Sequence, residues 1–151
     1  MHPDMPLGAL ISVIHRNHII ALNTRLKPLG LSAGQLPILL FLSRKEGIPQ
    51  EALARHFRLD KATIARGVKR LEDGGFICRQ IDPGNRRAYG LFLTGKGKEV
   101  RDDLRVIDAA WEEELLAIVP ERERDDVIQL LRTLADHSIF IAGTGREHDS
   151  P

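Results

Sequence analysis

The sequence has few cysteines and few aromatic residues, and this scarcity argues against several classes of protein. The 151 residues include a single cysteine, Cys78, so no disulfide framework can form within the chain, and a reducing compartment is favoured. Aromatic residues make up 5% of the chain, which disfavours an all-β sandwich, whereas leucine and isoleucine are plentiful and favour helices. The length suits one domain, or one domain with an extension, and the composition predicts a mainly helical chain.

Long hydrophobic runs are missing as well. The first twenty residues, MHPDMPLGALISVIHRNHII, have no basic leading region, and polar residues 15–18 interrupt the apolar run. A signal peptide or a membrane span requires a different pattern. We therefore expect a cytoplasmic protein.

Charge is unevenly distributed, although the net charge is only +1. Residues 61–87 contain seven basic and three acidic side chains, while residues 102–136 contain four basic and eleven acidic ones. A phosphate backbone would be attracted to the middle segment and repelled by the later one. A protein surface without any partner could carry the same charge distribution. Sequence motifs are therefore needed to distinguish a DNA-binding surface from such a surface.

Apolar spacing and capping residues predict helices in the first half of the chain. One helix is expected over about residues 6–26, ending at the breaker segment KPLGLS. Ser32 and Gln35 form a capping-box pattern for a second helix, which should run to Gly47. Pro37 would lie one turn inside that helix and distort it locally.

The only convincing strands lie in the middle of the chain, at residues 76–81 and 88–93. The intervening DPGNRR is typical of a turn, so the two strands should form a hairpin. A short helix opened by Pro49 and a fourth helix precede this hairpin. Thr94 should then cap one long helix, and Pro120 should begin the last. The middle of the chain is thus predicted to be a helix-turn-helix followed by a wing.

The fourth helix, KATIARGVKRLED with Asp60 as its N-cap, should bury one face and expose the other. Ile64, Val68 and Leu71 recur at four- and three-residue steps and define the buried face. The opposite face suits a DNA major groove, because a hydroxyl and long cations can reach base edges and phosphates. Gly67 lowers helix stability by about 1 kcal/mol relative to Ala, which a close groove wall or neighbouring helix would explain. The expected groove contacts are Thr63, Arg66 and Lys69, and the expected phosphate contacts are Lys61 and Arg70.

The turn of the hairpin strengthens the DNA interpretation over that of a merely solvated helix. A turn uses Pro, Gly and Asn, but it does not require the two adjacent arginines, Arg86 and Arg87, that follow Asn85. A cationic tip beside a recognition helix can enter the neighbouring minor groove. One arginine can instead fold back onto Asp82 or Asp73 and brace the wing.

The stretch from Glu51 to Gly97 resembles the MarR family of winged-helix regulators. It contains LA before a short turn, the helix exit RLEDGGFI, the wing DPGNRR and the sequence LTGKG before the next helix, in the order and spacing of that family. The flanking helices are similar in number and place. The resemblance implies a mainly α fold with a small β-wing, in which residues 31–94 form a winged helix-turn-helix DNA-binding domain. Residues 1–30 and 95–142 would form a helical dimerisation region, and residues 143–151 a disordered tail.

The same resemblance implies a homodimer with interlocked terminal helices, a palindromic operator of double-stranded DNA and, often, a small aromatic or anionic effector that weakens DNA binding. We expect a transcriptional regulator, with repression as the leading hypothesis. Some family members hold the effector between the dimerising helices and the winged domain. The candidate effector-binding residues are therefore His15, Arg16, His18 and Trp111. A tryptophan on an apolar stripe also fits a core position.

Two features depart from the family pattern. Asn85 stands where the family usually has an aspartate, which keeps the turn but weakens the expected brace on a wing arginine. Redox-sensing members carry a reactive cysteine in the first helix or at another partly exposed site, whereas Cys78 lies on a predicted strand. We therefore do not expect thiol sensing.

Other functions have little support in the sequence. The histidines near residue 16 lack partners at metal-binding spacing, so neither a metal nor another cofactor is expected. GKGKE does not have the spacing of a phosphate-binding loop, and no catalytic residues are apparent, so an enzyme is not expected. The remaining alternative is a winged-helix module that binds an acidic protein partner without specific DNA binding. Protein docking would not require an arginine tip, which favours DNA.

Overall fold

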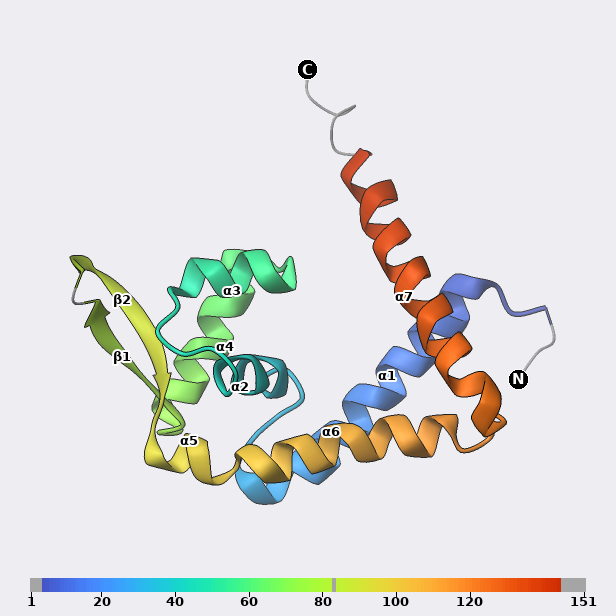
Figure 1. The fold of residues 1–151 in the computed structure, drawn as a ribbon, viewed down its shortest axis with the longest axis horizontal. Helices are drawn as coiled ribbons and strands as arrows, with labels where there is room; N and C mark the ends of the chain where they lie inside the picture. The colour runs from blue at the N-terminus through green and yellow to red at the C-terminus, as the bar shows by residue number, and fades with distance from the viewer. Residues whose placement is uncertain (1–3, 83, 145–151) are drawn as a thin grey trace. The chain divides into compact units, whose positions relative to one another are not determined.

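A computed structural model describes the backbone of residues 4–82 and 84–144, and their side chains except those of residues 82, 85–88, 143 and 144. Its helices and strands, apart from one short 3-10 turn, are labelled in Figure 1. They are α1 (Leu7–Leu26), the 3-10 turn η1 (Lys27–Leu29), α2 (Leu36–Leu42), α3 (Gln50–Phe57), α4 (Lys61–Asp73), β1 (Ile77–Asp82), β2 (Asn85–Leu93), α5 (Gly95–Glu99), α6 (Arg101–Leu116) and α7 (Glu121–Thr144). The predicted mainly helical fold with one antiparallel hairpin is therefore confirmed. The chain divides into two compact units, residues 1–111 and the remainder from Glu112 onward.

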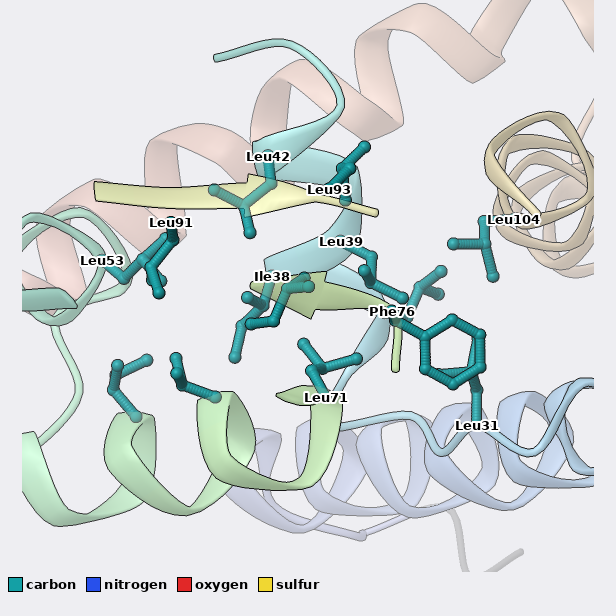
Figure 2. Close-up of a cluster of buried hydrophobic side chains, with 14 of the residues drawn as sticks. Leu31, Ile38, Leu39, Leu42, Leu53, Leu71, Phe76, Leu91, Leu93 and Leu104 are labelled. Atoms are coloured by element: carbon teal, nitrogen blue, oxygen red, sulfur yellow. The ribbon is translucent and has the colours of Figure 1, made fainter. Parts of the chain in front are cut away.

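The core of the first unit is built from leucines and isoleucines of α2, α3, α4 and the hairpin. Figure 2 shows Leu39, Leu71 and Phe76 among the side chains that converge there. Leu42, Leu53 and Val68 are fully buried as well. Each such side chain contributes about 1.5–3 kcal/mol through the apolar surface that it removes from water. This core fixes α3, α4 and the hairpin to one another.

The second helix begins later than the capping-box pattern predicts, and it ends before the predicted Gly47. Ser32 donates from its backbone N–H and its hydroxyl to Gln35 Oε1, at 2.9 Å each, but these bonds close a turn and α2 starts only at Leu36. Pro37 consequently lies in the first turn of α2, where a missing backbone donor costs nothing, rather than one turn inside it. The expected distortion at Pro37 is therefore not required.

After α2 the chain is no longer helical, and residues 47–48 pair with strand β2 of the hairpin. The predicted end at Gly47 is wrong, because α2 ends at Leu42. Farther on, Ile48 forms an antiparallel bridge with Leu91 of β2. Gly47 N–H donates to the Leu91 carbonyl at 2.8 Å, and Leu91 N–H donates to the Ile48 carbonyl at 2.9 Å. A Cβ on Gly90 would lie 2.9 Å from the Gly47 carbonyl carbon, so glycine permits this close approach.

The predicted long helix after the hairpin is two helices. Thr94 caps α5 as predicted, accepting from Gly97 N–H at 3.1 Å, but α5 ends at Glu99 and α6 starts at Arg101. The Thr94 hydroxyl also donates to the Gly75 carbonyl, and Lys96 Nζ donates to the Gly74 carbonyl. These bonds hold α5 against the junction between α4 and β1.

The hairpin is longer on one side than predicted, since β2 begins at Asn85 instead of residue 88. Its register pairs Ile77 with Leu93 and Ile81 with Tyr89, with an irregularity between Ile81 and Asp82. This pairing places the backbone of the two wing arginines within β2. Their side chains, and Pro83 of the turn, lie outside the described residues.

Apolar side chains remain exposed on α1 and α7. On α1, Leu7, Ile11 and Ile14 are about half exposed or more. Exposed apolar residues of α7 are Leu130, Leu131, Leu134, Ile139, Phe140 and Ile141. The predicted disordered tail falls mostly on residues 145–151, outside the description, but Gly143 and Thr144 belong to α7. Each helix thus presents an apolar surface that this single chain leaves uncovered.

Candidate nucleic-acid interface

The start of α4 is fixed by a short turn from α3. Arg58 adopts a left-handed backbone with φ 52° and ends α3. Asp60 is then extended, and its carboxylate accepts a hydrogen bond from Thr63 N–H at 2.8 Å, as the N-cap prediction requires. This geometry sets the direction in which α4 leaves α3.

The two faces of α4 are divided as the sequence predicts. Ile64, Val68 and Leu71 are at most 2% exposed, and they anchor the helix to the core. The predicted contact residues on the other face are exposed, apart from the half-buried Thr63. They are Lys61, Thr63, Arg66, Lys69 and Arg70. The helix therefore presents its cations away from the core.

The presence of glycine at position 67 is explained by the packing of α4 against α2, and a DNA groove wall is not needed to explain it. A Cβ at this position would lie 2.8 Å from Ile38 Cδ1 of α2. Close contact between α2 and α4 thus accounts for a residue that weakens the helix by itself.

Within the described part of the chain, the cations of α4 differ in their partners. Arg66 Nη2 donates to Thr63 Oγ1 at 3.0 Å. Lys69 Nζ pairs with the Asp73 carboxylate one turn later, and this hydrogen bond and charge raise the pKa of Lys69. Lys61 and Arg70 have no side-chain hydrogen bond or ion pair among the described residues, so they are free to meet an anion.

A residue with no role assigned by the sequence analysis braces the wing. Arg79 of β1 donates from Nε to Glu72 Oε1 of α4 at 2.8 Å and from Nη2 to Glu72 Oε2 at 3.2 Å. The same Nη2 donates to Gln50 Oε1 at the start of α3 at 2.9 Å. One guanidinium thereby ties β1 to both helices of the helix-turn-helix. The sequence gives little indication of this brace, because Gln50 lies 29 residues away from Arg79.

The predicted effector residues fall into two groups. His15 and Arg16 are exposed and line a surface hollow on the N-terminal segment, together with Met5, Ala9, Ser12 and Val13. His18 instead stacks on Trp111, with ring centroids 5.2 Å apart and planes inclined by 13°. Its Nε2 is buried and has no hydrogen-bond partner in the described structure. The four residues therefore do not form one cluster.

Other kinds of site receive no support from the described residues. No group of three or more His, Cys, Asp or Glu side chains among them could hold a metal ion. Cys78 is partly buried on β1, and Gln80 Nε2 lies 3.8 Å from its Sγ. Within residues 4–82 and 84–144, no helix is both long and apolar enough to cross a membrane.

Comparisons with known proteins agree with this geometry. Residues 31–89 match the model of the MarR family. YybA of Bacillus subtilis (strain 168), named as an uncharacterized HTH-type transcriptional regulator, is 36% identical over 109 residues, which are 72% of this chain and 73% of YybA. A MarR transcriptional regulator from Methanosarcina mazei Go1 has a crystal structure that superposes with a TM-score of 0.81 at 35% identity, covering 89% of this chain and 97% of that one.

A third similar structure is that of the transcriptional repressor CouR bound to a 23-mer DNA duplex. It has a TM-score of 0.77 and 24% identity, and the match covers 86% of this chain and 92% of CouR. At this identity the likeness concerns the fold. The fold, the exposed cations of α4 and the relatives together define a DNA-binding transcriptional regulator of the winged helix-turn-helix class. The chain belongs to the MarR family.

Proposed function

We propose that the protein is a homodimeric repressor that binds a palindromic duplex operator and is released by a small molecule. The observation that carries this proposal is the exposed cationic face of α4, anchored by a fully buried face and braced to the hairpin. In such an arrangement the helix occupies a major groove, and the wing reaches the adjacent minor groove.

The contacts are assigned by position and by the partners that each side chain already has. Arg66 and Thr63 lie in the first half of α4, where a recognition helix meets base edges. Lys61 and Arg70, which have no partner among the described residues, are the phosphate contacts. Lys69 must exchange its bond to Asp73 for a base or phosphate. Asn85, Arg86 and Arg87 are assigned to the wing contact through their place at the start of β2.

Dimerisation is supported by the apolar surfaces of α1 and α7. A monomer would leave Ile11, Ile14, Leu131 and Leu134 in water, at a cost of about 25 cal/mol for each Å² of apolar surface. We assign residues 1–30 and 95–142 to the dimerisation region and residues 31–94 to DNA binding. Two-fold symmetry then requires two half-sites about one helical turn apart, roughly 10–10.5 bp, or a multiple of that spacing.

An effector would act on this dimer through one of two groups, His18 with Trp111 of α6 or His15 with Arg16 on α1. The stacked rings of His18 and Trp111 suit an aromatic molecule, and the unpartnered Nε2 of His18 offers it a hydrogen bond. His15 and Arg16 suit an anionic one. Repression is favoured because a relative from Mycobacterium bovis, 24% identical over 131 residues, is named an HTH-type transcriptional repressor.

Selection from a randomised duplex library, followed by hydroxyl-radical footprinting of the selected sequence, tests the proposal. We expect two symmetric half-sites and protection of minor-groove positions flanking each of them. The double variant Arg86→Ala/Arg87→Ala should lose that flanking protection. It should also bind more weakly, because it lacks two positive charges that attract the phosphate backbone. A single asymmetric site, or selection of no sequence, would contradict the proposal. The protein-docking alternative predicts the latter result.

A further inference from the structure

A chain of hydrogen bonds at the start of α4 links three side chains. The Thr63 hydroxyl donates to Asp60 Oδ2, and Arg66 Nη2 donates to Thr63 Oγ1 at 3.0 Å. Asp60 Oδ1 accepts from Thr63 N–H at 2.8 Å. The N-cap carboxylate is thereby connected to the guanidinium of a predicted base-contacting residue.

The direction of these bonds follows from the number of hydrogens available. A threonine hydroxyl has one hydrogen and two lone pairs, and an ionised carboxylate can only accept. The pKa of Asp60 is lowered, first by the Thr63 hydroxyl, then by Thr63 N–H and, to a smaller extent, by the charge of Arg66. The hydroxyl hydrogen is thus committed to Asp60, and the oxygen lone pairs face Arg66. Thr63 cannot donate to a base while this chain is intact.

Arg66 keeps enough donors to read a base while it is held. A guanidinium has five N–H donors, and the bond to Thr63 uses one of them. Two of the remaining donors match O6 and N7 of guanine, the commonest specific arginine contact in a major groove. Lys69 does not compete for Thr63, because its ammonium pairs with Asp73 at the other end of α4.

We propose that Asp60 and Thr63 are positioning residues that hold Arg66 ready to read one guanine in each half-site. The inference rests on the proposed function, since it concerns how α4 reads DNA. It replaces the base contact that the proposed function assigns to Thr63 by a positioning role. Asp60, which is linked to Arg66 only through Thr63, becomes a determinant of specificity.

Full-length wild-type protein and the variants Thr63→Val, Thr63→Ser and Arg66→Ala would be titrated against the selected duplex and all its single base-pair substitutions. Arg66→Ala identifies the base pair that Arg66 reads, because discrimination disappears there. Thr63→Val is isosteric but removes the oxygen, and releasing a long side chain should reduce discrimination at that base pair by about three- to tenfold. Thr63→Ser retains the hydroxyl and should retain most of the discrimination.

Two further readouts separate positioning from a structural role. Thr63→Val added to Arg66→Ala should lower discrimination no further, because both changes remove one interaction. Carboxyl NMR should place the pKa of Asp60 below 3.8 in the wild type, and this pKa should rise in Thr63→Val but not in Thr63→Ser. A general loss of folding would instead lower the affinity for every duplex alike, without singling out the base pair that Arg66 reads.

A loss spread evenly over all base pairs, no loss in Thr63→Val, or an equal loss in Thr63→Ser would each overturn the inference. So would an Arg66→Ala effect that is not confined to one base pair of each half-site. All these results leave the proposed function standing, because the wild type still selects a sequence. A wild type that prefers no duplex would contradict the proposed function itself, and the inference with it.

Discussion

Single residues of the short helix α5 differ sharply in what surrounds them. A Cβ on Gly97 would collide with the carbonyl oxygen of Phe76, a backbone atom that cannot move aside, whereas a Cβ on Gly95 would meet nothing within 4 Å. Gly97→Ala should therefore lower the free energy of unfolding by about 1–3 kcal/mol through overpacking. The matched Gly95→Ala should be neutral or slightly stabilising, because alanine favours helix.

Urea unfolding of both variants measures this difference. Equal stabilities for the two would show that α5 does not pack on the junction of α4 and β1 in the way the structure places it. The comparison is useful because the two substitutions are chemically identical and lie two residues apart.

Individual elements owe their positions to a few contacts between distant residues. Arg79 joins β1 to α4 through both oxygens of Glu72, and its side chain is 40% exposed. Arg79→Ala should cost about 0.5–1 kcal/mol, the upper range for an exposed pair, because the geometry is bidentate. Amide hydrogen exchange should quicken in β1 and β2 more than in α4. Arg122→Ala in the exposed pair with Glu123 should have no comparable effect.

Unchanged exchange in the hairpin of Arg79→Ala would contradict the bracing role. A double-mutant cycle with Glu72→Ala should give a coupling free energy of about the same size as the single loss. That cycle distinguishes the ion pair from the loss of the separate bond to Gln50.

The elements that the sequence predicts well are those specified by neighbouring residues. Asp60 and Thr94 cap the helices that they were expected to cap, and the buried stripe of α4 follows from its spacing alone. The start of α2 was missed, because the Ser32 N–H bonds to the Gln35 side chain in this turn as it would in a capping box at a helix start. The bridge between Ile48 and Leu91 could not be foreseen, since it joins segments that no local pattern connects.

The candidate site divides in the same way. The exposed cations of α4 follow from helical spacing, so the sequence placed them on one face. The Arg79 brace, by contrast, depends on tertiary packing. So does the separation of His15 and Arg16 from the stacked pair His18 and Trp111. The sequence could not tell whether Gly67 makes room for a DNA groove wall or for a neighbouring helix. The close approach of Ile38 shows that the neighbour is α2.

The whole molecule is expected to be a dimer through the apolar surfaces of α1 and α7. Leu131→Asp/Leu134→Asp would place two charges on the exposed apolar face of α7 and should shift the protein towards monomer. Gln129→Glu adds a charge on the opposite side of the same helix and should not. Light scattering after size-exclusion chromatography at micromolar concentration measures the mass. A wild-type monomer, or a dimer that survives the double substitution, would contradict this assignment.

The central claim is that α4 and the wing bind duplex DNA through phosphates and base edges. Its most direct test is a fluorescence-anisotropy titration of the protein with the selected duplex at several salt concentrations, with scrambled competitor present. We predict binding that survives the competitor, with an affinity whose logarithm falls linearly with the logarithm of salt concentration. Failure to bind any duplex, even at low salt, would contradict the account.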